Sequence, residues 1–405
     1  MNTTPSNTKG QQYRTSEAVT EGHPDKIADQ IADAILDDVL ARDPLARVAV
    51  EALVSGSYVL VAGEVTTATE LGAARVCQIA RSVIGEIGYT APELGFCAQT
   101  VEIEVKLRRQ SREIAAAVGT PAITPENMGA GDQGIMIGYA ISETPELLPL
   151  PSVLAQNLAR QLASARKQGR LSFLRPDGKT QVTVEYEDGK ARRIEAIVVS
   201  AQHNPGVSQQ DLRDAIKQEI ILPIIPNNLV DENTRFYINP SGSFVDGGPA
   251  ADTGLTGRKL LVDTYGCAAN NGGGALSGKD PTKVDRSGAC AVRWAAKNLV
   301  ASGLCSEAEI ELAYTIGVAH PLAVSVTSRG TAVIEDWMLS RIVREVYDFR
   351  PGVIIETLQL RKPIYRQVSA YGHFGRPDLD LPWERLDRVD TIRRVVRSLC
   401  NDEAL

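Results

Sequence analysis

The stretch PDKIADQIADAILDDVLARDPLARVAVEALVSGSYVLVAGEVT, residues 24–66, decides the fold of this chain. Isoleucines recur every four residues from Ile27 to Ile35, which is the spacing of one face of an α-helix. Two runs rich in β-branched residues follow at 48–54 and 58–66, and the Ser-Gly-Ser between them is typical of a hairpin turn. The stretch therefore predicts a helix followed by a β-hairpin.

The same order of elements recurs twice further along the chain, after a helix at about 70–87 has completed the first copy. In the second copy we expect a preceding strand-like run at 134–140, a helix at 152–168, strands at 181–186 and 193–199 around the turn Asp188-Gly189, and a helix at 208–221. In the third copy we expect a strand-like run at 259–265, a helix at 286–302, strands at 309–317 and 322–328, and a helix at 334–348. The copies start about 130 residues apart, which is too far for a solenoid repeat and suits separate domains.

Three copies of one pattern predict an α+β fold of three similar α/β domains with pseudo-threefold symmetry. We expect an N-terminal domain at 12–112, a central domain at 129–245 and a C-terminal domain at 247–385. The intervening segment, 113–128, lies in a run of glycine, proline and small residues. Such a run predicts an active-site lid or linker.

The composition narrows the class of protein. Apolar residues make up 43% of the chain, and no apolar run approaches the roughly 20 residues that span a bilayer. The first dozen residues are polar, which argues against a signal peptide and favours a frayed tail, so we expect a cytoplasmic protein without a membrane partner. A formal charge of −7 offers no general affinity for nucleic acid, so a polyanion site must be a local cluster of cations.

The first such cluster is GHPDK at 22–26. Pro24 suits the first position of a helix and places His23 at the cap, and the free N–H groups of a helix N-terminus suit a phosphate. Asp25 suits Mg²⁺, which favours carboxylates together with substrate phosphates. The alternative is that Asp25 only complements the helix dipole.

The second cluster is GKDPTKVDRS at 278–287. Lys279, Lys283 and Arg286 are cations on a glycine-rich loop, a pattern that neutralises phosphate, and an interleaved acid indicates a second metal. The run GGALSGKD nearly matches a P-loop, but Asp280 replaces the metal-binding hydroxyl and Pro281 prevents a helix from starting there. We therefore reject a P-loop nucleotidase, and a solvated run of charges remains the alternative.

Three further stretches carry weaker signals. In TGRK at 256–259, Arg258 and Lys259 suit phosphate, although such pairs are common on surfaces. In RPDGKTQV the Asp-Gly is explained by a turn alone. Glu51 and Glu64 lie inside apolar strand runs, so each carboxylate either faces solvent or binds a cation or amine. The remaining histidines have no metal-type spacing and are interpreted as structural.

Taken together, these loops resemble one family, the S-adenosylmethionine synthetases, also called methionine adenosyltransferases. The resemblance runs from about Arg14 to Phe374, and GAGDQG at 129–134 is one of its two most specific motifs. The second specific motif is GGGALSGKDPTKVDRS at 272–287. The other matching stretches are SEAVTEGHPDKIADQIADAILD (16–37), FYINPSG (236–242), GLTGRK (254–259), VDTYG (262–266) and AYGHFGR (370–376).

The resemblance implies that methionine sulfur attacks C5′ of ATP and expels triphosphate, which is then hydrolysed to phosphate and diphosphate. It also implies two Mg²⁺ ions and one K⁺ per site, and a homodimer or homotetramer with active sites at the dimer interface. Carried over by position, the metal ligands are Asp25 and Asp285 for Mg²⁺ and Glu51 for K⁺.

The resemblance also assigns substrate-binding and catalytic residues. The implied ATP-binding residues are His23, Asp177, Gly178, Lys179, Ser243, Phe244, Asp252, Arg258, Lys259, Ala275 and Lys279. The implied methionine-binding residues are Glu64, Gln110, Asp132, Asp252, Lys279 and Lys283. The implied catalytic residues are His23, Lys179, Arg258, Lys259, Lys279 and Lys283.

Two stretches depart from the family pattern. The lid reads QSREI from Gln110, where the family has QSPDI, and Ser243 and Asp246 stand where the family has Arg and Ile. An altered lid is the one feature that favours a catalytically silent subunit. Another ATP-dependent phosphotransferase is the second alternative, and it would release ADP.

Overall fold

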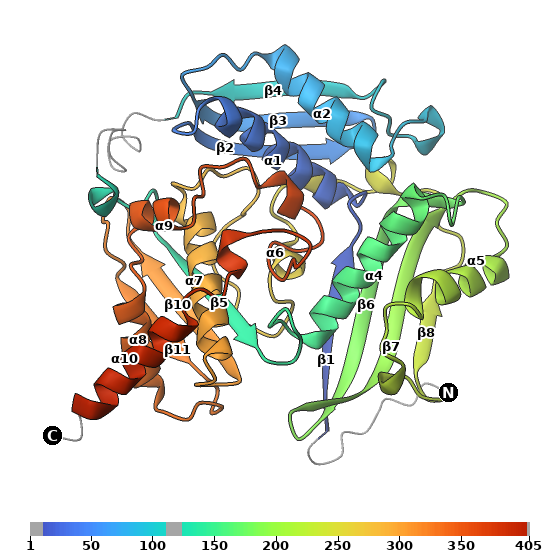
Figure 1. Ribbon diagram of the computed structural model, residues 1–405. Helices are drawn as coiled ribbons and strands as arrows, with labels where there is room; N and C mark the ends of the chain where they lie inside the picture. Colours follow the sequence, from blue (N-terminus) through green and yellow to red (C-terminus); the bar gives the residue numbers. More distant parts are fainter. Residues whose placement is uncertain (1–10, 111–123, 403–405) are drawn as a thin grey trace.

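The computed structural model describes residues 11–110 and 124–402 of the chain, and Figure 1 shows them as three lobes around a common centre. Each lobe combines helices with a β-sheet, and α1, α4 and α7 lie on the inner side of the three lobes (Figure 1). None of the helices in the described ranges is long and apolar enough to cross a membrane. Most of the predicted lid, 113–128, lies outside the described residues.

The first copy of the pattern contains the predicted helix and hairpin. Pro24 takes the first helical position of α1, and the hairpin pairs β2 with β3 in antiparallel register. The elements are β1 (Gln11–Val19), α1 (Pro24–Arg42), β2 (Arg47–Ser55), β3 (Tyr58–Thr66), α2 (Ala73–Ile87) and β4 (Glu102–Arg108). The strand β1 was not predicted, because its polar residues have no apolar alternation and its two first residues were interpreted as a frayed tail.

The second copy repeats this order. Asp188 and Gly189 both have positive φ, as a two-residue hairpin turn requires, and they join β6 to β7 as predicted. The elements are β5 (Gly134–Ile141), α4 (Leu150–Lys167), β6 (Leu174–Glu187), β7 (Lys190–His203), α5 (Gln209–Ile216), which continues into a π-helical turn (Lys217–Ile221), and β8 (Arg235–Ile238).

The third copy differs from the prediction at its start. The run 259–265 was predicted as a strand, but it contains the short helix α6, because Asp263 turns inward to bind buried Lys26. The elements are β9 (Gly254–Leu255), α6 (Leu260–Asp263), α7 (Val284–Ala301), β10 (Glu307–Tyr314), β11 (Ala323–Thr327), α8 (Asp336–Val346), α9 (Pro351–Thr357) and α10 (Val389–Asp402). Short 3-10 helices lie at Pro92–Leu94, Pro125–Asn127, Asn227–Leu229, Gly248–Ala250, Arg366–Val368 and Pro382–Glu384.

The three sheets exchange their first strands in a cycle. Strand β1 of the first copy joins the second copy's sheet, in the order β1-β6-β7-β8. Strand β5 of the second copy joins the third copy's sheet, in the order β11-β10-β5, and β9 of the third joins the first, in the order β4-β3-β2-β9. All three exchanged strands pair antiparallel with the first strand of a hairpin. The predicted α+β fold with pseudo-threefold symmetry is therefore confirmed, whereas the predicted domain boundaries stay a prediction.

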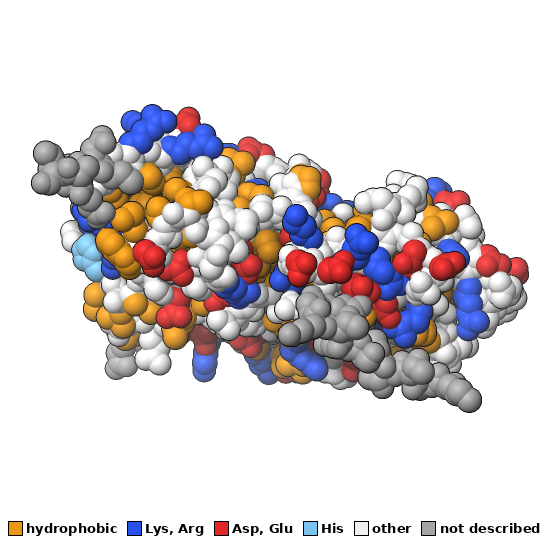
Figure 2. Space-filling model, turned by 90° about the horizontal axis from the view of Figure 1, so that it is seen from below, with side chains coloured by type: hydrophobic (Ala, Val, Ile, Leu, Met, Phe, Trp, Pro, Cys, Tyr) orange, Lys and Arg blue, Asp and Glu red, His pale blue; other side chains and the backbone are white. Residues whose placement is uncertain are grey.

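Each lobe has its own apolar core between the inner face of its sheet and its helices. Side chains of β2 alternate between buried and accessible, so the sheet keeps a second face away from the helices. The surface seen from below shows Lys and Arg mixed with Asp and Glu, and apolar side chains gathered at one end (Figure 2).

Candidate active site

The N-terminus of α1 is capped by His23, as predicted. The His23 side chain is buried, and its Nδ1 accepts the backbone N–H of Asp25 at 3.2 Å. In a neutral imidazole one nitrogen accepts and the other donates, so the proton of His23 lies on Nε2. The cap therefore leaves Nε2–H as a hydrogen-bond donor at the start of the helix.

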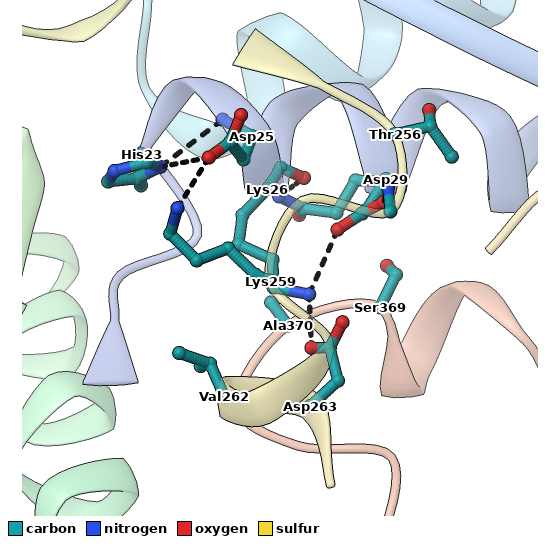
Figure 3. Close-up of polar contacts among 12 residues, drawn as sticks. His23, Asp25, Lys26, Asp29, Thr256, Lys259, Val262, Asp263, Ser369 and Ala370 are labelled. Atoms are coloured by element: carbon teal, nitrogen blue, oxygen red, sulfur yellow. Dashed lines mark hydrogen bonds and ion pairs between the residues drawn. The ribbon is translucent and has the colours of Figure 1, made fainter. Parts of the chain in front are cut away.

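Asp25 connects this cap to the TGRK loop. Its Oδ1 accepts the N–H of Leu255 at 3.0 Å, and its Oδ2 lies 2.6 Å from the Lys259 Nζ (Figure 3). Arg258 approaches the same carboxylate, with 3.8 Å between its guanidinium and Oδ1. Burial alone would raise the pKa of Asp25, but hydrogen bonds from Lys259 and Leu255 outweigh it and lower the pKa.

Strand β1 pairs with β6, which carries Asp177 and Lys179, and so brings the end of β6 close to His23. Val19 pairs with Lys179 at the end of β1, four residues before His23. Burial, together with the positive charges of Lys259 and Lys179, lowers the pKa of His23 to about 3. Near neutral pH His23 is thus uncharged. We call His23, Asp25, Lys179, Arg258 and Lys259 the α1 cluster.

Asp177 is buried and only partly satisfied. Its Oδ2 accepts the N–H of Gly248 at 2.9 Å, whereas its Oδ1 has no hydrogen-bond partner among the described residues. Burial raises the pKa of Asp177 to about 6. A buried acceptor without a partner is costly, so this oxygen is available to a ligand donor.

The loop SGKD at 277–280, which we call the SGKD loop, runs along the part of the β2 edge that β9 leaves unpaired. Lys279 lies opposite Ala49, and the N–H of Val50 donates to the carbonyl of Gly278 at 3.0 Å. The Nζ of Lys279 lies 2.5 Å from Asp285 Oδ2, and the other oxygen of Asp285 accepts the N–H of Gly274 at 2.9 Å. This loop therefore repeats the lysine–aspartate pair of the α1 cluster.

Lys279 and Asp285 line a cavity of about 580 Å³, which we call the Lys279 cavity. It brings together all three residues assigned to methionine alone, although Glu64 is paired with Arg108 at 2.7 Å. The lining residues are Ala49, Glu64, Arg108, Arg109, Gln110, Gly131, Asp132, Lys279, Lys283 and Asp285. Strand β9 pairs with Leu53 and Val54 of β2, and Lys279 pairs with Ala49. Ala49 and Leu53 are four residues apart, so Lys279 and Leu255 of β9 pair with points about 14 Å apart on one edge of β2, at about 3.4 Å per residue.

The other predicted residues lie around these two groups. Phe244 and Gln202 lie against Gly247, next to the Gly248 that binds Asp177. Ala275 lies against Gly257 and joins the two cationic loops. The remaining positions are a buried Gly178 on β6, an exposed Glu51 on β2, and exposed Ser243 and Asp252 on the loops before and after Gly248.

Arg286 was interpreted as a phosphate-binding cation, and that interpretation is wrong. Its guanidinium is buried and binds both oxygens of Asp33, at 2.6 and 2.9 Å. The reason is that α7 begins at Val284, which turns Arg286 into the protein interior. Lys26, Asp29 and Asp263 form a second buried ion cluster that sequence reasoning missed (Figure 3). The signal was present as aspartates every four residues in α1.

The donor set suits Mg²⁺ bound together with substrate. Among residues 11–110 and 124–402, no three His, Cys, Asp or Glu side chains gather as a dedicated metal cage. Asp25 and Asp285 are instead two separate carboxylates, each beside a lysine. Mg²⁺ is commonly held by one or two carboxylates, waters and substrate phosphates, and this arrangement fits that pattern.

The fold and these groups define a class: a three-domain α+β protein with cationic loops suited to a polyphosphate. The chain matches the N-terminal, central and C-terminal domains of S-adenosylmethionine synthetase at residues 11–112, 127–244 and 246–385. It is also 53% identical over 386 residues to the S-adenosylmethionine synthase of Desulforudis audaxviator (strain MP104C), covering 94% of this chain and 97% of that protein.

The chain belongs to the S-adenosylmethionine synthetase family. It is accordingly a transferase of S-adenosylmethionine synthesis that uses ATP and methionine. The sequence resemblance is thereby confirmed, and the individual roles of the site residues stay predictions.

Proposed function

We propose that the α1 cluster and the Lys279 cavity are the two halves of the catalytic site that joins methionine to the adenosyl group of ATP. The observation that carries the proposal is the repeated lysine–aspartate pair, Lys259–Asp25 at 2.6 Å and Lys279–Asp285 at 2.5 Å. A phosphate chain with a divalent cation can replace each internal ion pair without leaving a buried charge unpaired. The nearby methionine-assigned residues supply polar groups for an amino acid.

The chemistry requires leaving-group stabilisation more than base catalysis. The sulfur of methionine carries its own lone pair, attacks C5′ of ATP, and becomes a sulfonium as the C5′–O bond breaks. The electron pair of that bond goes to the triphosphate. Preorganised cations are the strongest means of stabilising such a developing charge. In this role we place Lys179, Arg258, Lys259 and Lys279, with Lys283 beside them in the cavity.

His23 has a distinct part in this step. Its Nδ1 is occupied by the N–H of Asp25, so Nε2–H is the donor that remains. A low pKa keeps the ring neutral, and a neutral donor binds the departing oxygen without transferring a proton to it. His23 therefore suits the oxygen that leaves C5′.

The carboxylates and the remaining residues position the substrates. Asp25 and Asp285 would hold Mg²⁺, and Glu51 would hold K⁺. Bound Mg²⁺ supplies positive charge to phosphate oxygens during bond cleavage and the later hydrolysis of triphosphate. Asp177 offers its free oxygen to ATP. Gly178 of β6 and the loops that carry Ser243, Phe244, Asp252 and Ala275 surround the same end of the site.

We infer that two subunits complete each site. The loop between β10 and β11 exposes Ile316, Val318 and Leu322, and its Gly317 donates to Ala130 beside the cavity at 2.8 Å. Exposed apolar side chains of this kind are suited to burial by a second copy.

Co-expression of two inactive variants tests the shared site. Lys259→Ala removes one half and Asp132→Asn the other, so a mixed dimer holds one site with both halves intact. We expect co-expression to restore about a quarter of wild-type activity, because half of the dimers are mixed and each has one good site. Each variant expressed alone is the control, and activity no greater than the controls would contradict a shared site.

Product analysis separates the reaction from its rivals. The purified chain with ATP, methionine, Mg²⁺ and K⁺ should form S-adenosylmethionine, phosphate and diphosphate in equal amounts. ADP as the product would identify a phosphotransferase, and no turnover by a folded chain would identify a silent subunit.

A further inference from the structure

Helix α1 carries aspartates at four-residue intervals: Asp25, Asp29, Asp33 and Asp37. Residues four apart lie on the same side of an α-helix, so the four carboxylates form one stripe. Asp29 and Asp33 are completely buried, and Asp25 is nearly so. Buried carboxylates at this spacing need partners along the whole stripe.

The partners are backbone N–H groups of segments between residues 255 and 366. Asp29 Oδ1 accepts the N–H of Gly257 at 2.9 Å, and Asp33 Oδ1 accepts the N–H of Gly278 at 2.8 Å. Asp25 accepts Leu255 in the same way at 3.0 Å, and Asp37 accepts Tyr365 and Arg366 at 3.1 and 2.8 Å. One helix face therefore anchors three separate loops.

Two of these anchors have the same construction. Gly257 has φ +80° and Gly278 has φ +79°, a left-handed conformation that favours glycine. A Cβ on Gly257 would lie 2.4 Å from the Ala275 Cβ, and one on Gly278 would lie 1.8 Å from the Val50 carbonyl oxygen. The next residue in each loop is a cation of the proposed site, Arg258 or Lys279.

The charges of the two anchoring carboxylates are balanced within the protein. Asp29 binds Lys26 at 3.0 Å, and Lys26 also binds Asp263 (Figure 3). Asp33 binds Arg286 through both oxygens. Since Asp29 and Asp33 are covered by these partners and by the loops, neither carboxylate is accessible to a substrate.

We propose that Asp29 and Asp33 are positioning residues that set where Arg258 and Lys279 stand, by anchoring the glycine that precedes each cation. The inference rests on the catalytic roles proposed for those two cations. Consecutive anchors are four residues apart, so α1 holds the two glycines about 6 Å apart along its axis. A displacement of about 1 Å in a group that stabilises charge can lower turnover by about 100-fold.

Asp29 allows a matched pair of variants, because Lys26 keeps Asp263 as a partner when Asp29 is neutral. Asp29→Asn keeps an oxygen acceptor for Gly257, and Asp29→Leu has nearly the same shape without an acceptor. We expect Asp29→Asn to stay within about threefold of wild-type kcat and Asp29→Leu to lose about 30-fold. A kcat that falls equally in both variants would overturn the proposal.

The decisive measurement is a pair of double-mutant cycles on turnover. If Asp29 acts through Arg258, Asp29→Leu should cost less than about threefold in an Arg258→Ala background. In a Lys279→Ala background it should still cost about 30-fold. Losses that multiply independently in both backgrounds would indicate a general structural role and overturn the positioning. Full activity of Arg258→Ala alone would instead overturn the role of Arg258.

A second variant keeps the test decisive if Asp29→Leu does not fold. Asp29→Glu keeps the charge and moves the carboxylate by one methylene, about 1.5 Å. We expect at least a tenfold loss of kcat with a folded protein, and little further loss when Arg258→Ala is added. Wild-type turnover of Asp29→Glu would overturn the proposal.

Discussion

The α1 cluster and the Lys279 cavity contain the same lysine–aspartate pair in different surroundings. In the α1 cluster the Asp25 side chain is 3% exposed and sits at a helix N-terminus, held by a backbone N–H. In the cavity Lys279 is 20% exposed, and the pair borders a space of about 580 Å³. Lys259 and Lys279 are nearly equally exposed, at 18% and 20%, whereas Asp25 is more buried than Asp285, at 3% against 13%. The α1 cluster therefore has the more buried carboxylate, and the cavity has room for a ligand. Under the proposed function, methionine binds in the cavity and the leaving phosphates contact the cluster together with Lys279 and Lys283 at the edge of the cavity.

The largest expected effect comes from removing a single cation, either Arg258 of the α1 cluster or Lys279 of the cavity. We expect Arg258→Ala and Lys279→Ala each to lower kcat by about 10²–10³, the loss seen when one preorganised charge donor is deleted. Steady-state formation of S-adenosylmethionine measures both. A loss below threefold in either variant would remove that group from the proposed site.

His23 tests whether the α1 cluster acts on the leaving oxygen. His23→Asn should lower S-adenosylmethionine formation by about 10- to 100-fold, the value of one hydrogen bond to a charged group. Hydrolysis of added tripolyphosphate should fall much less, because that reaction has no oxygen leaving C5′. Equal losses in the two assays would place His23 elsewhere in the mechanism.

The pH dependence of turnover tests whether Asp177, beside the α1 cluster, binds ATP. Burial raises its pKa to about 6, so the carboxylate is ionised above that pH and protonated below it. If the ionised form accepts a hydrogen bond from ATP, kcat/KM for ATP should fall about fivefold between pH 6 and pH 5. Asp177→Asn should be about tenfold less active at pH 8 and should lack this acid limb. An unchanged limb in the variant would assign it to another group.

Substitution of Glu64 has the smallest expected effect and tests whether the Lys279 cavity binds methionine. Glu64→Gln should raise KM for methionine about threefold to tenfold and leave kcat nearly unchanged, because it removes a binding charge from a half-exposed position. Thermal stability should barely change, since the Arg108 partner is 80% exposed and such ion pairs contribute little. A change in KM for ATP alone would contradict the assignment.

Local signals predicted the helices and hairpins well. The isoleucine spacing and Pro24 predicted helix α1. The dipeptide Asp188-Gly189 predicted the hairpin turn, and both residues have the positive φ that this turn requires. The three residues assigned to methionine alone were found from resemblance and lie together in one cavity.

Long-range partners were not predictable from local signals. The run 259–265 has strand-like residues, yet Asp263 folds inward to a lysine 237 positions away. Arg286 looks like a loop cation in sequence and is a buried partner of Asp33. The exchange of β1, β5 and β9 among sheets has no sequence signal, because a strand's pattern shows its two faces and not its neighbour.

The stripe on α1 has a consequence for how the chain is made. A nascent chain acquires Asp37 early, but the backbone N–H of Arg366 that binds it is 329 residues later. At about 5–20 residues per second, the ribosome needs roughly 15–65 s to supply it. During that interval the helix carries acids whose native partners do not yet exist, and water must solvate them. The first lobe is therefore expected to mature last, after synthesis is nearly complete.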